Sequence, residues 1–317
     1  MIIFISALAA IIPMSLYLII IWRFDRYERE PFKLVLANYF WGALGAVALA
    51  LIASFAVNSF ASLLIKDKIQ LEHFGSMAIA PVVEEITKGL FLLITMSSRK
   101  FDNILDGIVY GGAIGLGFGM TENFLYFVTY NSSLPNWIAL MVIRSLFSGV
   151  MHCLSTASLG AFLGLAKFQS KIFKYITAFF GLFLAIGIHS IWNTTLSVDG
   201  IEYVGFVFLI SSVFIFAIIF KVSLNRERKL ILNELEEETE IGTIPKAHLQ
   251  ILSSSQRERK GWFDERNRKL YINAATTLAF RKIQARKSSG VSKTYYEQDI
   301  INFRKFITNL LTNSQSV

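Results

Sequence analysis

Two adjacent glutamates and a lysine interrupt one of the apolar stretches of this sequence. The segment reads Pro81-Val-Val-Glu84-Glu85-Ile-Thr-Lys88. If it is helical, Lys88 lies one turn beyond both carboxylates, at i+4 from Glu84 and i+3 from Glu85, and can keep either of them ionised. An ionised carboxylate shielded from bulk water can act as a general base, and the spacing alone leaves open which of the two would do so.

Polar side chains of the kinds used in acid–base chemistry recur in three later apolar stretches. Glu122 and Asn123 are adjacent in the first of them, His152 lies in the second, and His189 and Asn193 lie in the third. Four residues along a helix return a side chain to nearly the same face, so the imidazole of His189 and the amide of Asn193 can address one bound group. Carboxylates and imidazoles together can supply the base, the acid and the oxyanion donor that peptide hydrolysis requires.

The elements that must hold these residues are membrane-spanning helices. The 317-residue chain is 54% hydrophobic and 17% charged, which excludes an ordinary soluble domain. A spanning helix needs about 20 mostly apolar residues. The predicted fold class is therefore all-α, a polytopic transmembrane helix bundle of about seven spans with a helical, soluble C-terminal tail. The expected spans are residues 2–22, 34–64, 74–96, 103–129, 137–166, 173–197 and 202–220.

The fourth expected span carries a stripe of small residues. Gly107, Gly111, Gly115 and Gly119 recur every four residues, and Glu122 follows one turn later. Small residues let two helices approach closely within lipid, so the stripe predicts tight helix packing. Glu122 is therefore expected to face protein rather than lipid.

The depth of the polar groups gives a separate argument for one shared site. At 1.5 Å per residue, Glu84 lies about 15 Å below the outer end of its span, Glu122 about 10 Å and His189 about 12 Å. If Arg144 extends its side chain to the outer interface, His152 lies about 12 Å below that level. The four groups are thus expected in one layer of the bundle.

The distribution of lysine and arginine predicts the orientation of the chain. These residues are concentrated in the first, third and fifth connections, so the positive-inside rule places the N-terminus outside and the tail in the cytoplasm. Residues 1–220 are expected to form the membrane domain, and residues 221–317 a basic tail with 18 Lys and Arg against 11 Asp and Glu. The expected partner of this positive charge is the anionic surface of the lipid bilayer, and a cytoplasmic protein that binds the tail is an open alternative. Nucleic acid is not expected as a partner, because no known nucleic-acid-binding motif accompanies the positive charge.

Each polar group also has a structural interpretation. The two glutamates and the lysine can be a buried ion pair without a chemical role, and the histidines can simply join helices by hydrogen bonds. Cys153 is the only cysteine and is expected to be a small core residue. No GxSxG-like turn surrounds the serines beside the histidines, so a serine mechanism is disfavoured.

Three alternatives stay open: a metal-dependent mechanism and two other functions. The carboxylates and histidines could bind Zn²⁺, although no HExxH motif is present and a site without a metal or other cofactor is favoured. A proton relay through them would make the chain a proton-coupled transporter, which the lack of obvious inverted halves disfavours. A non-catalytic scaffold would use the glycine stripe to hold a partner helix.

The order of these motifs resembles that of the PrsW-type intramembrane proteases, relatives of the CAAX prenyl endopeptidases. An early polar segment, Asp25-Arg-Tyr-Glu-Arg-Glu-Pro31, also looks like the loop after the first helix in this family, and the resemblance covers roughly residues 15–200. The matching motifs are Glu84-Glu85-x-x-Lys88, Phe118-x-x-x-Glu122-Asn123, His152 with Thr156, and His189-x-x-Trp192-Asn193.

The resemblance implies proteolysis of a membrane-anchored protein near the outer face of a bacterial plasma membrane, with anti-sigma factors as the family's known type of substrate. It assigns the activation of water to Glu84 or Glu85 and the holding of that water to Glu122 and His152. His189 and Asn193 would stabilise the oxyanion. Lys88 and Asn123 would support the site.

Overall fold

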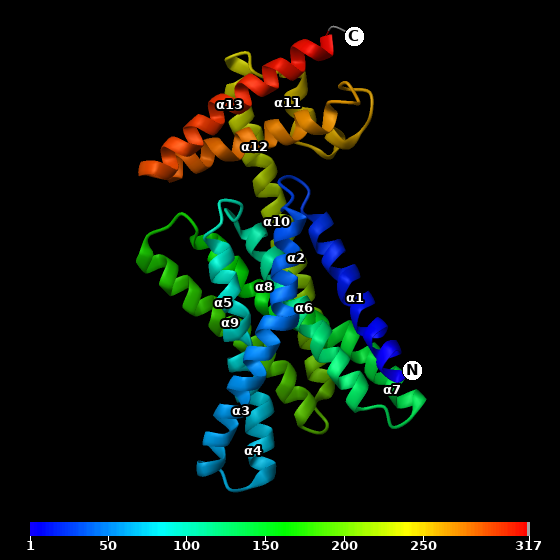
Figure 1. The fold of residues 1–317 in the computed structure, drawn as a ribbon. Coiled ribbons are helices and arrows are strands. Elements are labelled where there is room, and N and C mark those ends of the chain that lie inside the picture. The colour runs from blue at the N-terminus through cyan, green and yellow to red at the C-terminus, as the bar shows by residue number, and fades with distance from the viewer. Residues whose placement is uncertain (316–317) are drawn as a thin grey trace. The chain divides into compact units, whose positions relative to one another are not determined.

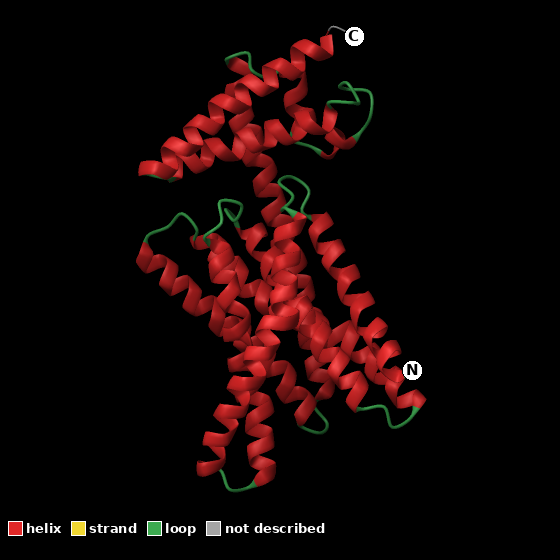
Figure 2. Cartoon of the chain, viewed as in Figure 1, coloured by secondary structure: helices red, strands yellow, loops and turns green. Residues whose placement is uncertain are grey.

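Helices make up the regular structure of this chain. The computed structural model describes residues 1–315, and in that part Figure 2 shows helices and connecting loops but no strand. The all-α class expected from the sequence is confirmed. The chain divides into two compact units, Met1–Asp25 with Glu30–Phe220, and Arg26–Arg29 with Lys221–Val317.

The first unit is a bundle whose helices follow the predicted segments closely (Figure 1). In chain order its elements are α1 (Ile2–Phe24), α2 (Phe32–Phe40), η1 (Trp41–Ala46), α3 (Val47–Leu64), α4 (Lys68–Phe74), η2 (Gly75–Ile79), α5 (Ala80–Met96), α6 (Ile104–Thr129), α7 (Leu134–Ile143), η3 (Arg144–Ser148), α8 (Gly149–Ala166), α9 (Lys171–Ser197) and the first part of α10 (Glu202–Glu240).

The segments η1, η2 and η3 are π-helical turns that join the helices on either side of them. Such turns are rare and occur frequently at functional sites. Here η2 leads directly into α5, which carries Glu84, and η3 leads directly into α8, which carries His152. Two of the helices that bear candidate residues are therefore entered through irregular turns.

Six helices within residues 1–315 are long and apolar enough to cross a membrane, so the chain is a multi-pass membrane protein. The expectation of about seven spans differs by one segment. Residues 74–96 are helical as predicted, but α5 carries three charged residues, Glu84, Glu85 and Lys88, within its 17 residues. The six are Ile2–Phe24, Phe32–Leu64, Ile104–Thr129, Leu134–Ala166, Lys171–Ser197 and Glu202–Glu240.

The glycine stripe of α6 packs tightly against another helix, as the sequence predicted, and that helix is α8. A Cβ built on Gly107 would lie 1.9 Å from the carbonyl oxygen of Gly160, and one built on Gly115 would lie 2.0 Å from that of His152. Neither position has room for a side chain. The stripe therefore fixes how closely the helix bearing His152 approaches the helix bearing Glu122.

Local sequence fixes the ends of two of these helices. α6 begins at a capping box in which the Asn103 side chain accepts from the backbone of Asp106, and the Asp106 side chain accepts from the backbone of Asn103. Between α9 and α10 the chain reverses at Gly200, whose φ of 85° favours glycine. Cys153 lies buried in the core beside α6, as expected.

The second unit is helical, as predicted for the tail. Its first helix does not begin at residue 221, because α10 continues without a break to Glu240. Gly242 and Pro245 interrupt the helical structure after α10, and α11 (Lys246–Leu252), η4 (Ser255–Glu258), α12 (Arg268–Lys287) and α13 (Gly290–Gln315) follow.

Buried ion pairs hold α10, α12 and α13 together. Glu238 is fully buried and accepts from Arg304 at 2.8 and 3.0 Å, and Lys282 Nζ lies 2.8 Å from its Oε1. Burial acts to raise the pKa of Glu238, but the hydrogen bonds from Arg304 and Lys282 outweigh it and lower the pKa below its usual value. Glu238, one of the acidic residues of the tail, therefore has a structural role.

Candidate active site

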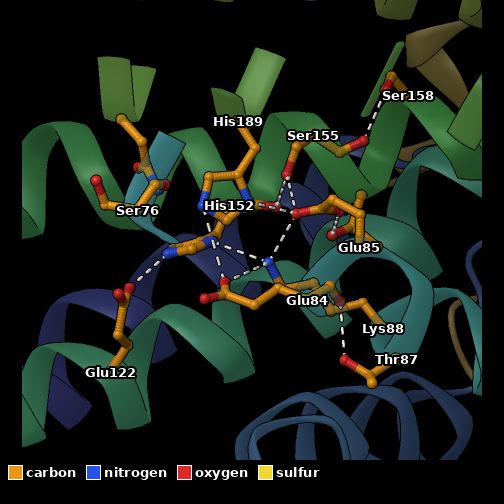
Figure 3. Close-up of polar contacts among 12 residues, drawn as sticks. Ser76, Glu84, Glu85, Thr87, Lys88, Glu122, His152, Ser155, Ser158 and His189 are labelled. Atoms are coloured by element: carbon orange, nitrogen blue, oxygen red, sulfur yellow. Dashed lines mark hydrogen bonds and ion pairs between the residues drawn. The ribbon is translucent and has the colours of Figure 1, made fainter. Parts of the chain in front are cut away.

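Lys88 lies at the centre of the polar cluster, and its side chain is completely buried. Its Nζ lies 2.7 Å from Glu85 Oε1, 3.7 Å from Glu84 Oε2 and 2.9 Å from His152 Nδ1 (Figure 3). The contacts with both glutamates are those that the i+3 and i+4 spacing predicts. A further contact, at 4.0 Å from the centre of the Phe118 ring, places the ammonium against an aromatic face.

Glu85 is the carboxylate whose acceptor positions are filled. Its Oε1 accepts from Lys88 at 2.7 Å and from Ser155 at 3.0 Å, and it lies 3.0 Å from His189 Nδ1. Its Oε2 accepts from Thr156 at 3.1 Å. A fully buried carboxylate with four donors is held as a fixed anion, and it has little capacity left to take a proton from water.

Glu84 is the carboxylate that keeps an acceptor position open. Its Oε2 is buried and has no hydrogen-bond partner among residues 1–315, although Lys88 Nζ lies 3.7 Å and His189 Nε2 3.8 Å away. Buried carboxylate oxygens are normally hydrogen-bonded, so an unfilled acceptor indicates a position for another group. The two adjacent glutamates therefore have different surroundings.

His152 connects Lys88 with Glu122. Lys88 Nζ lies 2.9 Å from His152 Nδ1, and Glu122 Oε2 lies 2.5 Å from His152 Nε2. Because an ammonium can only donate, Nδ1 must accept, and the proton of the neutral ring is on Nε2 and is donated to Glu122. Both nitrogens of this buried histidine are thus engaged.

His189 has the opposite tautomer. Its Nδ1 donates to the Glu85 carboxylate at 3.0 Å, which leaves Nε2 of the neutral ring as an acceptor. That nitrogen is the one 3.8 Å from Glu84 Oε2, so two acceptors face each other across a short gap. The gap is suited to a group that brings protons or positive charge. The rings of His152 and His189 lie edge to face, with 4.8 Å between their centres.

Arg144 belongs to the cluster, which the sequence did not predict. Its side chain was expected to reach the outer interface, but it is buried and pairs with Glu122, at 2.7 Å between Nη2 and Oε2. Nε donates to Asn123 Oδ1 at 3.0 Å, and the guanidinium lies 3.6 Å from the centre of the Tyr126 ring. The Glu122 carboxylate lies 22 residues earlier in the chain, on another helix, and so large a sequence separation hides the pair from sequence analysis. The available signal was the rarity of an arginine inside an apolar segment.

The two asparagines have different positions. Asn123 is buried and joins the cluster through Arg144. Asn193 lies one helical turn beyond His189, but its Nδ2 donates to the backbone oxygen of Ser76 in η2 at 2.9 Å. The cluster itself joins four helices, α5, α6, α8 and α9, through Glu84, Glu85, Lys88, Glu122, His152 and His189.

A cavity of about 310 Å³ adjoins the Glu122 side of the cluster. Glu122, Arg144, His152 and Asn193 line it, whereas Glu84, Glu85 and Lys88 do not. Three carboxylates and two permanent cations make up the charges of the cluster, which leaves one negative charge when both histidines are neutral.

One group of side chains in the cluster could hold a metal ion. Glu84, His152 and His189 each offer a ligand atom, and these atoms lie within 4.8 Å of one another. Two histidines and a carboxylate are a ligand set known from catalytic zinc sites. Glu85, which accepts from His189 Nδ1, is placed like the outer carboxylate that commonly orients a metal-binding histidine.

Comparison with known proteins matches most of the first unit. A family model described as "PrsW family intramembrane metalloprotease" covers residues 30–220. A relative called Protease PrsW from Oceanobacillus iheyensis is 31% identical over 165 residues, 52% of this chain and 70% of the relative. No solved structure matches the chain.

Two further relatives carry the same name. The one from Bacillus subtilis is 28% identical over 153 residues, 46% of this chain and 62% of the relative. The one from Clostridioides difficile is 27% identical over 200 residues, 61% of this chain and 79% of the relative. The similarity therefore concerns the part of the chain that contains the cluster.

Proposed function

As a member of the PrsW family, this chain is a membrane-embedded protease, and we propose that it hydrolyses a peptide bond in a membrane-anchored protein with water activated by Glu84. The observation that carries the proposal is the gap between Glu84 Oε2 and His189 Nε2. These atoms are 3.8 Å apart, both accept hydrogen bonds, and Oε2 has no hydrogen-bond partner among residues 1–315.

A water molecule in this gap would donate one proton to each acceptor. Its two lone pairs would then be directed away from both acceptors, and one of them could attack an incoming carbonyl carbon. Glu84 would take the proton as the water attacks and pass it to the leaving amine. Glu85 would keep His189 Nε2 available by holding the proton of the ring on Nδ1. The different partners of Glu84 and Glu85 support the assignment of the base to Glu84.

The oxyanion requires donors on the opposite side of the carbonyl. Asn193 and Arg144 line the cavity, and both can donate, so we assign the stabilisation of the developing charge to this wall. His189 fits the water better than the oxyanion, because its neutral ring has no proton on Nε2 in this arrangement. Asn193 keeps the role that the family resemblance gave it.

A metal-dependent form is the second candidate, because the ligand set of Glu84, His152 and His189 fits a divalent ion. When bound, such an ion would make water nucleophilic at neutral pH and polarise the carbonyl. Two contacts oppose it: the Lys88 ammonium lies 3.7 Å from Glu84, and His152 would have to give up one of its present hydrogen bonds. We therefore keep the metal-free form as the proposal.

The substrate we propose is a single-span signalling protein, such as an anti-sigma factor, cut near the outer face of the plasma membrane. The support is the family membership together with the lysine and arginine distribution, which favours an outer N-terminus and a cytoplasmic tail. The bilayer and a cytoplasmic protein are the partners proposed for the basic tail.

The test compares newly formed protein N-termini in cells that contain equal amounts of the wild type, Glu84→Gln or the control Glu72→Gln. Glu72 is exposed and lies in α4, outside the cluster. Cleavages near membrane spans that occur with the wild type and Glu72→Gln but not with Glu84→Gln support the proposal. Identical sets of termini in all three would refute it, and Glu84-dependent proton flux in protein-only liposomes would then favour a transporter.

Chelation separates the two chemistries. The metal-free form predicts that purified protein keeps its cleavage activity after chelation and dialysis. The metal-dependent form would be favoured instead if the purified protein contains stoichiometric zinc, loses its activity when the zinc is removed, and regains it when zinc is added back.

A further inference from the structure

The cavity beside Glu122 and His152 has a wall that the proposed reaction does not use. One side of the cavity is polar, with Glu122, Arg144, His152 and Asn193. In Figure 3, Glu122 and Ser76, which also lines the cavity, lie on one side of His152, and Lys88 and Glu85 lie on the other. The remaining wall is largely apolar, with two serines, Ser148 and Ser197, among the side chains of Tyr126, Leu140, Ile143, Met151, Trp192 and Leu196.

The rim of the cavity is apolar and exposed. Ile143 in α7 is 39% exposed, and Leu196 in α9 is 43% exposed. Both residues belong to helices that are long and apolar enough to span a membrane. An apolar rim on such helices suits the entry of a polypeptide from the hydrocarbon region, where an open polar entrance would be costly.

The charges of the cavity select against a charged occupant. Arg144 is paired with Glu122 and bonded to Asn123, so an acidic side chain beside Arg144 would also lie close to the Glu122 carboxylate. A basic side chain would place a second cation beside this guanidinium. The volume of about 310 Å³ is at the lower end of the range for small-ligand pockets, which is suited to one large side chain.

We propose that this cavity is the subsite that binds a large apolar side chain of the substrate, next to the peptide bond that is cleaved. The inference rests on the proposed function, since Arg144 and Asn193, which are assigned there to the oxyanion, line this cavity. It adds the class of residue that is recognised: leucine, isoleucine, methionine or phenylalanine in a membrane-spanning segment, presented from the lipid side.

The experiment narrows the cavity by substitutions at its rim and identifies the substrate residues on either side of each cleaved bond. Ile143→Trp places a large ring at the mouth, and its matched control is the neighbouring Val142→Trp, which is 44% exposed and does not line the cavity. A second pair is Leu196→Trp with the control Ile191→Trp, which is 42% exposed. All four changes are at exposed positions, so folding should tolerate them. The termini are compared in cells at equal protein levels.

The expected result has three parts. Wild type shows one position beside the cleaved bond that is enriched in large apolar residues. The ratio of large to small residues at that position falls at least about tenfold in Ile143→Trp and Leu196→Trp, because a filled pocket rejects the larger side chains. The two controls keep the wild-type ratio.

An unchanged residue preference in all four variants, with cleavage intact, overturns the subsite and leaves the protease proposal standing. The same loss of preference in the controls also overturns it, because a general disturbance would then explain the effect. If the wild type produces no Glu84-dependent cleavage, the proposed function fails and the subsite fails with it.

Discussion

Replacing Gly115 by alanine should separate α6 and α8, the two helices that carry Glu122 and His152 of the cluster. A Cβ at this position would lie 2.0 Å from the carbonyl oxygen of His152, whereas real Cβ atoms essentially never come within 3.0 Å of such a neighbour. The backbone of α8 must therefore move by at least about 1 Å, since neither atom is the flexible end of a side chain. His152 would move with it, away from Glu122 at 2.5 Å and Lys88 at 2.9 Å.

Both stability and activity should fall. Forcing an extra methyl group into a closely packed interface costs about 1 to 3 kcal/mol of unfolding free energy. A misplacement of about 1 Å at a reacting group can reduce the rate about 100-fold. We expect Gly115→Ala to show both effects, with the larger one on kcat.

The assay combines thermal unfolding in detergent with cleavage per folded molecule. The matched control is Gly187→Ala in α9, where a Cβ would meet nothing within 4 Å. Alanine there should raise stability by about 0.5 to 1 kcal/mol, because glycine is a poor helix former, and should leave cleavage unchanged. A Gly115→Ala protein as stable and as active as the wild type would contradict the close approach of α6 and α8.

Four further predictions follow from particular side-chain contacts. Glu85→Gln should lower the unfolding free energy by about 3 to 5 kcal/mol, because it leaves the buried Lys88 ammonium without its closest carboxylate. Glu84→Gln should change stability by less than about 1 kcal/mol while abolishing cleavage, and equal thermal destabilisation of the two variants would contradict their different roles. Arg144→Lys should lower kcat about 100-fold with little change in KM, because an ammonium cannot hold Glu122 and the Asn123 amide in the same fixed geometry. A change in KM alone would indicate that Arg144 acts only in substrate binding. In the tail, the pKa of Glu238 is lower in the folded than in the unfolded state, so ionised Glu238 stabilises the fold above its unfolded pKa near 4.3, and this stabilisation is lost as the pH falls through the folded pKa. Proteolysis of the tail in the full chain should therefore increase at low pH. Glu238→Gln should be cleaved faster than the wild type at pH 7, and its cleavage should change less on acidification.

The parts of the fold that could be predicted were those set by local pattern. Long apolar runs gave the helices, and the four-residue glycine spacing gave the packing of α6 on α8. The spacing of Glu84, Glu85 and Lys88 gave their mutual contacts, because i+3 and i+4 neighbours meet on any helix. The continuation of α10 through residue 221 was missed, since charged residues that favour helix do not mark where a span ends.

The partners of each site residue could not be predicted, because they depend on contacts between helices that are distant in sequence. Nothing near Arg144 in the chain indicates that Glu122 will neutralise it. The different surroundings of Glu84 and Glu85 depend likewise on Ser155, Thr156 and His189, which lie on two other helices. Adjacent residues on a helix point about 100° apart. The packing of the other helices therefore decides which carboxylate has all its hydrogen-bond acceptor positions occupied and which keeps one unoccupied.

The most direct test of the central claim is cleavage by purified protein in liposomes. The protein is reconstituted with a single-span substrate found by the comparison of termini, in water enriched in ¹⁸O. The account predicts that the wild type cuts the substrate near one end of its span and places ¹⁸O in the new carboxyl terminus, and that folded Glu84→Gln leaves the substrate intact. Cleavage by Glu84→Gln at the wild-type rate, or an intact substrate with the wild type under the same conditions, would contradict the claim that this cluster carries out the hydrolysis.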